Sequence, residues 1–91
     1  MTSDWAVYIL RCVDGSLYTG ITMDVTRRVA EHNGSNRQGA KYTRARRPVK
    51  LVYTEVSSDR SRAAQREHQI KQMSHKEKEA LIHSADLHGQ T

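Results

Sequence analysis

Residues 7–22 read VYILRCVDGSLYTGIT, two runs of bulky side chains on either side of a turn signal. β-Branched and aromatic residues favour strands, and a pair such as Asp14-Gly15 is typical of a β-hairpin turn. We therefore predict a hairpin whose strands cover residues 5–12 and 17–22. Gly20 weakens the second strand and indicates that another group approaches the backbone closely there.

Each predicted strand carries one tyrosine, Tyr8 in the first and Tyr18 in the second, although the chain has only 4 tyrosines. Tyrosine is a good strand former, so both side chains can serve packing alone. Alternatively, they share one face of the hairpin and belong to a site. The rest of the sequence has to decide between these interpretations.

The segment after the hairpin predicts one helix and one long connection. Thr22 or Asp24 can cap a helix that runs to about Asn33, and Gly34 is a stop signal. Residues 35–48 show no clear period, are rich in arginine and end in a proline. We interpret them as a basic connection with at most one helical turn.

The second half of the chain predicts one more strand and two helices. Residues 49–56 alternate as a strand does, with odd-numbered side chains on one face and even-numbered ones on the other. Residues 57–59 offer N-caps for a helix to about Met73, and Ser74 with Glu77 forms a capping box that opens a last helix. The order β-β-α-β-α-α predicts an α+β fold, a small three-stranded antiparallel sheet flanked by helices.

Length and composition bound the class of protein. A chain of 91 residues has room for one small core, so we expect a single domain over residues 1–83 and a flexible C-terminal tail over residues 84–91. The single Cys12 cannot form an internal disulfide, and no apolar run has the length of a membrane span or a signal peptide. We expect a cytoplasmic protein that does not bind membranes.

The charge of the chain favours a polyanionic partner. The formal net charge is +5, the pI is about 9.7, and arginine outnumbers lysine. Arginine can hold phosphate oxygens with two hydrogen bonds, and each neutralised phosphate releases counterions. A basic surface is common, so charge alone makes nucleic acid a favoured partner without establishing it.

The predicted helix after residue 59 places a carboxylate among apolar side chains. On a helical wheel Ala63, Ala64 and Ile70 mark the inward side, and Glu67 falls between them. A buried charge is costly unless it meets a cation or a metal. Glu67 is therefore either paired with one of the many arginines or available to hold a metal ion.

The first predicted helix shows a related pattern. Val25 and Val29 define its inward side, and Arg28 and His32 border the same stripe, four residues apart. Such residues are often structural, because an arginine stem can cover apolar surface and a histidine can pack. One inward glutamate, one arginine, one histidine and two strand tyrosines are nevertheless more polar chemistry than a thin core readily holds.

Other chemistries fit these residues less well. No histidine pair has the helical spacing of a zinc site, no glycine-rich phosphate loop is present, and Cys12 with His32 makes only a weak thiol site. The basic surface and the single inward carboxylate favour phosphodiester chemistry with a hard divalent ion.

These residues, taken together, resemble the GIY-YIG nuclease superfamily, in particular its short stand-alone bacterial members. Val7-Tyr8-Ile9 stands where the first half of the signature lies, and Tyr18-Thr19-Gly20 matches the second half. Val7 replaces the first glycine of the signature, and Thr19 replaces the usual isoleucine.

The resemblance continues beyond the hairpin. In the family an arginine follows ten residues after the second tyrosine and a histidine four residues later, which are here Arg28 and His32. The run AAQREHQIK resembles the helix with the family's metal-binding glutamate, here Glu67, followed by Lys71. The similarity covers about residues 5–82.

The resemblance implies a metal-dependent endonuclease that hydrolyses phosphodiester bonds in DNA with low intrinsic sequence specificity, acting in DNA repair or recombination. Glu67 would hold one Mg²⁺ or Mn²⁺, and Arg28 would stabilise charge on the phosphoryl oxygens. One tyrosine would position or deprotonate the attacking water and the other would orient the phosphate; the sequence does not assign the two tasks, and Tyr8 is the preferred base. His32 would assist proton transfer or hold a tyrosine hydroxyl.

The implied site sets a condition on the hairpin, because both tyrosines must face one surface. A two-residue Asp14-Gly15 turn would send them to opposite faces. A three-residue connection through Ser16 would pair Cys12 with Tyr18 and place both tyrosines on one face. We therefore predict a longer turn or a bulge.

The resemblance also suggests partners. Family nucleases usually carry a further DNA-binding domain; we expect none here, a monomer, and a protein partner that supplies targeting. The candidate nucleic-acid-binding residues are Arg27, Arg37, Lys41, Arg44, Arg46, Arg47 and Lys71. An alternative is a non-catalytic nucleic-acid-binding module that retains the fold, and a third hypothesis is an adaptor whose basic surface meets an acidic protein.

Overall fold

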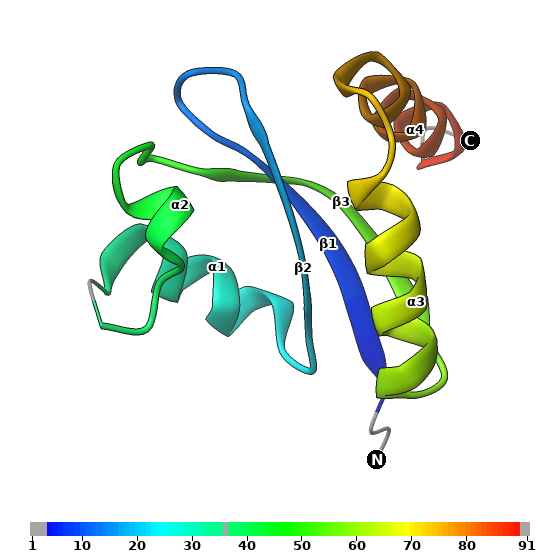
Figure 1. Ribbon diagram of the computed structural model, residues 1–91, viewed down its shortest axis with the longest axis horizontal. Coiled ribbons are helices and arrows are strands. Elements are labelled where there is room, and N and C mark those ends of the chain that lie inside the picture. Colours follow the sequence, from blue (N-terminus) through cyan, green and yellow to red (C-terminus); the bar gives the residue numbers. More distant parts are fainter. Residues whose placement is uncertain (1–3, 36, 90–91) are drawn as a thin grey trace.

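The structure, a computed structural model, describes residues 4–35 and 37–89 of the chain and confirms the predicted α+β class. A three-stranded antiparallel sheet has the strand order β2-β1-β3, so that β1 lies in the centre (Figure 1). Helices α1 and α2 lie on one side of the sheet, and α3 lies on the other (Figure 1). The elements are β1 Trp5–Arg11, β2 Leu17–Thr22, α1 Val25–Gly34, α2 Lys41–Arg44, β3 Lys50–Ser57, α3 Arg60–Lys71 and α4 His75–Gly89.

The β1–β2 hairpin places both tyrosines on one face. Tyr8 is opposite Gly20 and Leu10 is opposite Tyr18, and residues that pair directly share a face of the sheet. The predicted same-face arrangement is therefore confirmed. The predicted partner of Tyr18 is wrong, because Leu10 and not Cys12 lies opposite it.

The turn of the hairpin explains this register. The Cys12 N–H donates to the Ser16 carbonyl oxygen at 2.9 Å, which leaves the three residues 13–15 as the loop. Gly15 has a φ of 86°, a left-handed conformation that costs glycine little. The Asp14 carboxylate accepts hydrogen bonds from both the backbone N–H (3.0 Å) and the hydroxyl (2.6 Å) of Ser16. The connection is longer than a two-residue turn, as predicted.

The central strand is buried on both faces and so builds two small cores. Val7 and Ile9 pack with the apolar side chains of α3 and α4. Tyr8, Leu10 and Cys12 lie on the other face, toward α1 and α2. The buried Tyr8 therefore carries a hydroxyl into the α1 side of the molecule.

The strand β3 departs from the strict alternation predicted for residues 49–56. Leu51 pairs with Leu10 but Tyr53 pairs with Ile9, so a β-bulge interrupts the register between them. Leu51 and Tyr53 consequently face opposite sides of the sheet, and the expected alternation is wrong across this bulge.

The helix boundaries follow the predicted caps. Asp24 and Asp59 accept hydrogen bonds at the starts of α1 and α3. Ser74 and Glu77 bond reciprocally, with the Ser74 N–H at 2.8 Å from Glu77 Oε1 and the Glu77 N–H at 3.1 Å from Ser74 Oγ.

The helix α4 extends to Gly89, past residue 83, where the predicted domain ends and the predicted tail begins. Residues 90 and 91 of that tail lie outside the described residues. Arg11 on β1 meets Glu79 on α4 at 2.6 Å. Within the described parts of the chain, no helix combines the length and apolar character needed to cross a membrane.

Candidate active site

Tyr8 lies directly over Gly20 on the neighbouring strand. A Cβ atom added at Gly20 would stand 2.5 Å from the Tyr8 hydroxyl oxygen and 2.7 Å from Cζ. The sequence prediction of a close approach at Gly20 is confirmed, and the group that approaches is the Tyr8 ring. The glycine therefore allows the Tyr8 hydroxyl to reach across β2.

The Tyr8 hydroxyl contacts a buried chain of polar side chains. Its oxygen lies 2.9 Å from His32 Nε2, and His32 Nδ1 lies 2.9 Å from Thr43 Oγ1. Tyr8 is 1% exposed, and His32 and Thr43 are fully buried. The hydrogen-bonded chain thus links β1, α1 and α2. His32 is more deeply buried than its predicted position at the border of the helix stripe indicates.

Aromatic rings surround this chain. The Tyr18 ring lies 5.1 Å from the His32 ring in an edge-on contact and 6.4 Å from the Tyr8 ring, centroid to centroid. Tyr42 stacks on Tyr18 at 5.9 Å, and the Arg46 guanidinium carbon lies 4.0 Å from the centroid of the Tyr42 ring. Tyr18 is only partly buried, so the rings lead from the buried histidine toward solvent.

Arg28 brings a positive charge to the Tyr8 hydroxyl. One guanidinium nitrogen of Arg28 donates to Glu31 Oε1 at 3.0 Å and to the Gln38 carbonyl at 2.6 Å. The guanidinium also acts on the Tyr8 hydroxyl and lowers the Tyr8 pKa. Glu31 and the Gln38 carbonyl therefore hold the arginine beside the tyrosine.

Burial controls the ionisation of the two central groups. It raises the pKa of the Tyr8 hydroxyl to about 12, although Arg28 opposes the rise. It also lowers the pKa of His32 to about 4, and the nearby charge of Arg28 acts in the same direction. At neutral pH Tyr8 is a phenol and His32 a neutral imidazole.

Glu67 lies on α3. Its side chain is 23% exposed and lies 3.4 Å from Lys71 Nζ. Its negative charge raises the pKa of Tyr8, so it acts on the same hydroxyl as Arg28. Because α3 packs on the edge strand β2, the carboxylate approaches from the opposite side of the sheet to α1.

The Glu67 carboxylate is a suitable ligand for a hard divalent ion. Within residues 4–35 and 37–89, no group of three or more His, Cys, Asp or Glu side chains could enclose a metal. Mg²⁺ commonly keeps several waters and takes only one or two carboxylates from the protein. A lone, partly exposed carboxylate such as Glu67 is compatible with that coordination.

Comparison with known proteins identifies the family. A family model described as the GIY-YIG catalytic domain matches residues 4–80. The chain belongs to the GIY-YIG family. The predicted resemblance is thereby confirmed.

Relatives of this GIY-YIG chain include UPF0213 proteins. The UPF0213 protein of Desulfotalea psychrophila is 54% identical over 82 residues, which cover 90% of this chain and 74% of that protein. The UPF0213 protein of Natronomonas pharaonis is 54% identical over 82 residues, covering 90% of this chain and 94% of that protein.

Solved structures share the GIY-YIG fold seen here. A solution NMR structure of an E. faecalis protein matches with a TM-score of 0.63 and 41% identity, over 92% of this chain and 88% of that one. The NMR structure of a Bacillus halodurans UPF0213 protein matches with a TM-score of 0.55 and 44% identity, over 87% of this chain and 82% of that one.

The structure brings some of the site residues predicted from the GIY-YIG resemblance closer together than others. Tyr8, Tyr18, Arg28 and His32 form one connected cluster. Glu67 is linked to this cluster through its charge on Tyr8. Whether these residues catalyse a reaction stays a prediction.

Sequence reasoning missed two residues of this cluster, Thr43 and Tyr42. Both lie in α2, within the connection that showed no clear period. The only signal was the expected single helical turn, which does not tell which side chains face inward.

The candidate nucleic-acid-binding residues differ in their surroundings. Arg37, Lys41 and Arg44 are exposed. Arg27 pairs with Glu31 at 3.2 Å, Arg46 with Asp14 at 3.2 Å and Lys71 with Glu67 at 3.4 Å. Arg47 is half-buried and donates to the carbonyl oxygens of His32 and Ser35 at the end of α1. Its guanidinium thus stabilises that helix end, and nucleic-acid binding by the group stays a prediction.

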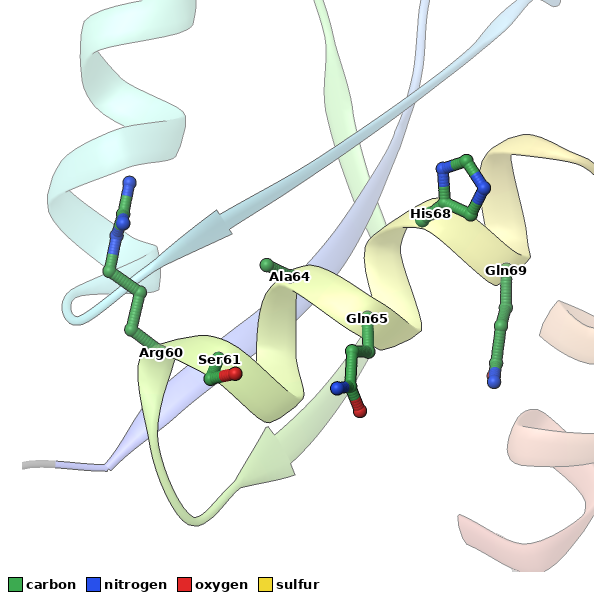
Figure 2. A pocket seen from close by; sticks show the side chains of 6 residues that line it. All are labelled: Arg60, Ser61, Ala64, Gln65, His68 and Gln69. Carbon is green, nitrogen blue, oxygen red and sulfur yellow. The ribbon is translucent and has the colours of Figure 1, made fainter.

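One surface hollow lies away from the cluster. It has a volume of about 870 Å³ and follows the outer side of α3, where Arg60 and His68 project away from Gln65 and Gln69 (Figure 2). A smaller hollow of about 230 Å³ at the start of α1 includes Arg28 among its lining residues. Of these two hollows, only the smaller exposes a residue of the site.

Proposed function

We propose that this GIY-YIG protein is a metal-dependent endonuclease that hydrolyses phosphodiester bonds in DNA with low intrinsic sequence specificity. The observation that carries the proposal is the surroundings of the Tyr8 hydroxyl. This oxygen lies 2.9 Å from His32 Nε2, and the charges of Arg28 and Glu67 act on it. A tyrosine can act as a general base, a fixed cation can stabilise charge on the phosphate, and a carboxylate can hold a metal ion, all of which favour phosphodiester hydrolysis.

In this proposal Glu67 holds a Mg²⁺ or Mn²⁺ ion. A bound divalent ion supplies positive charge that polarises the phosphate and stabilises the leaving oxygen. The partial exposure of the Glu67 side chain supports this role, because the ion would keep most of its waters. Lys71 pairs with the carboxylate at 3.4 Å and is half exposed, so it can move aside.

Arg28 binds the phosphoryl oxygens. Glu31 and the Gln38 carbonyl already fix its guanidinium, so little side-chain freedom remains to be lost when a phosphate arrives. The neighbouring hollow at the start of α1 gives the guanidinium a route to solvent.

Tyr8 would first lose its phenolic proton to solvent and, as the anion, accept the proton of the attacking water, and Tyr18 would orient the phosphate. With a pKa of about 12, the free Tyr8 phenol is a weak candidate for this task, so its anion needs added stabilisation. Arg28 provides part of it through its positive charge. A divalent ion on Glu67 would provide another part, because it would offset the negative charge of Glu67, which is one of the causes that raise the Tyr8 pKa.

The exposed cations provide the contact with the nucleic-acid backbone. Arg37, Lys41 and Arg44 lie in and before α2, the element that also carries Thr43. A basic surface next to the cluster would hold a phosphate chain across it. Such contacts carry no base readout, which agrees with low sequence specificity.

A nucleic-acid-binding module without catalysis is the second candidate. The observation that favours it is the raised pKa of Tyr8, which keeps the phenol protonated at neutral pH in the free protein. This candidate predicts binding that does not depend on Glu67.

Cleavage of DNA by matched variants tests the proposal. Wild type, Glu67→Gln and Glu77→Gln would be incubated with supercoiled and branched DNA, with Mg²⁺, Mn²⁺ or EDTA. The control Glu77→Gln removes a carboxylate from a capping box, a position that accepts glutamine. We expect metal-dependent cleavage by wild type and Glu77→Gln and none by Glu67→Gln. Equal binding without cleavage in all three proteins would favour the binding module.

A further inference from the structure

The proton on the His32 ring has two possible positions, and they have opposite consequences for Tyr8. A proton on Nε2 makes the ring a donor to the Tyr8 oxygen, 2.9 Å away. A proton on Nδ1 leaves Nε2 as an acceptor for the Tyr8 O–H. The surroundings of Nδ1 decide between these tautomers.

Two groups of the 40–43 segment face His32 Nδ1. The backbone N–H of Ala40 points at Nδ1 from 3.5 Å, and the Thr43 hydroxyl lies 2.9 Å from it. The backbone N–H can only donate and cannot rotate away, whereas the hydroxyl can donate or accept. A proton on Nδ1 would face the Ala40 proton, and a bare Nδ1 accepts from both groups.

The Thr43 hydroxyl can donate its one proton either to His32 Nδ1 or to the Ala40 carbonyl oxygen, each 2.9 Å away. That oxygen already accepts the backbone N–H groups of Thr43 at 3.1 Å and Arg44 at 3.2 Å. Two backbone donors satisfy its two lone pairs, so it does not need the Thr43 proton.

We propose that Thr43, together with the Ala40 backbone N–H, is a positioning residue that holds His32 in the tautomer with its proton on Nε2, so that His32 donates to the Tyr8 oxygen. The tautomer is a property of the folded protein and does not depend on catalysis. Its use in a reaction rests on the proposed nuclease function.

The consequence lies at the Tyr8 oxygen. It accepts a hydrogen bond from His32 Nε2–H, and the Arg28 charge acts on the same oxygen. The phenolic proton is then not directed at His32, and a Tyr8 anion would keep the His32 donor together with the positive charge of Arg28. In the other tautomer the phenolic proton would be bound to His32, and the anion would have one donor fewer. Thr43 thus prepares Tyr8 to receive a proton without touching it.

Long-range ¹H–¹⁵N NMR of the histidine rings at pH 7 tests the tautomer directly. Comparison with His32→Gln assigns the His32 signals among the 5 histidines of the chain. We expect wild type to show a protonated Nε2 and a bare Nδ1. A protonated Nδ1 in wild type would overturn the proposal, whatever the variants do.

Variants of Thr43 test its part. Thr43→Val keeps the shape and removes the hydroxyl, and we expect both tautomers to become populated; Thr43→Ser keeps the hydroxyl and should keep the wild-type tautomer. An unchanged tautomer in a folded Thr43→Val protein would show that Thr43 does not hold it. Should Thr43→Val fail to fold, the wild-type spectrum still decides the tautomer.

A kinetic comparison tests the use of the tautomer. We expect Thr43→Val to lower kcat by roughly 10-fold with KM unchanged, as loss of an outer partner of an active-site histidine does, and Thr43→Ser to restore it. Equal kcat in wild type and Thr43→Val would show that the His32 tautomer does not affect catalysis. If wild type does not cleave DNA, the proposed function fails while the NMR result on the tautomer stands.

Discussion

At the scale of single residues, the contact between Tyr8 and Gly20 joins the fold to the chemistry. A small side chain on β2 is required because the tyrosine ring occupies the space where a Cβ would stand. The glycine therefore sets the position of the hydroxyl that meets His32 and Arg28.

Gly20→Ala should displace this hydroxyl. The new Cβ would stand 2.5 Å from the Tyr8 oxygen, and overpacking of this kind costs about 1–3 kcal/mol in the free energy of unfolding. Urea unfolding measures the loss, and DNA cleavage by the folded variant should also fall. Gly34→Ala is the control, because no atom lies within 4 Å of the added Cβ there. Equal stabilities of the two variants would contradict the close packing.

His32 makes the stability of the protein depend on pH. Its pKa is lowered from 6.5 to about 4 in the folded protein, first by burial and then by the charge of Arg28, with Arg47 adding to the effect and Glu31 opposing it. Between these two values the unfolded chain binds a proton that the folded protein does not, so the free energy of unfolding falls as pH falls. The contribution is fully present above pH 6.5, and its complete loss amounts to about 3 kcal/mol.

Urea unfolding at a series of pH values checks this dependence. Glu31, Asp14 and Glu77 have lowered pKa values and also remove stability on acidification. The difference in slope between wild type and His32→Gln isolates the histidine. Parallel curves for the two proteins between pH 6.5 and 4 would show that His32 binds its proton equally in both states.

The sequence predicted individual residues where they follow a local pattern. Helical spacing brought Arg28 and His32 to one side of α1, and an inward carboxylate drew attention to Glu67. Thr43 was not predicted because its contact with His32 joins two residues 11 positions apart in different helices, and no sequence period relates these positions. The family resemblance supplied the roles that spacing alone leaves open.

At the scale of elements, the hairpin turn sets which side chains share a face. The two tyrosines share a face whenever Tyr18 lies opposite an even-numbered residue of the neighbouring strand. Both the predicted partner, Cys12, and the observed partner, Leu10, meet this condition. The exact register depended on the loop over residues 13–15, where Gly15 adopts a positive φ and Asp14 binds Ser16. Several turns are compatible with an Asp-Gly pair, so the sequence could not select this one.

Gly15→Ala tests the turn. No atom lies within 4 Å of an added Cβ, so the cost comes from the φ of 86° alone, about 1 kcal/mol in the free energy of unfolding. Gly15→Asn should lose less, because asparagine tolerates this conformation better. Thermal and urea unfolding measure both variants. An alanine variant as stable as wild type would mean that the turn relaxes without strain.

The caps and the bulge show the same division between local and non-local information. Asp24, Asp59 and the Ser74–Glu77 box follow from a few neighbouring residues, and each cap forms as predicted. The bulge between Leu51 and Tyr53 arises from pairing with β1, far away in the sequence, and the alternation of β3 gave no warning of it.

At the scale of the whole molecule, the site draws on both sides of the sheet. Tyr8, Tyr18, Arg28 and His32 belong to the α1 side, whereas Glu67 comes from α3. Because β2 is an edge strand, side chains from the two sides can meet around it. The order of elements predicted the layering, but it did not determine the strand order, because three strands can be arranged in more than one order.

The distribution of charge over the whole molecule gives the last prediction. If the surface around α2 holds a nucleic-acid backbone, removing cations there weakens binding more than removing cations elsewhere. Arg37→Gln with Lys41→Gln removes two exposed charges on that side, and Lys76→Gln with Lys78→Gln removes two from α4. Both double variants lower the net charge of +5 equally, so a difference between them reports position and not total charge.

The salt dependence of binding measures that difference. The logarithm of affinity falls with the logarithm of salt concentration by roughly 0.9 for each phosphate neutralised on duplex DNA. Loss of both contacts in the α2 variant should therefore lower the slope by about 2, and the α4 variant should keep the wild-type slope. Binding would be measured in EDTA, so that cleavage does not deplete the DNA. Equal slopes in the two double variants would mean that DNA responds to the net charge of the molecule, and the surface around α2 would then have no special part in binding.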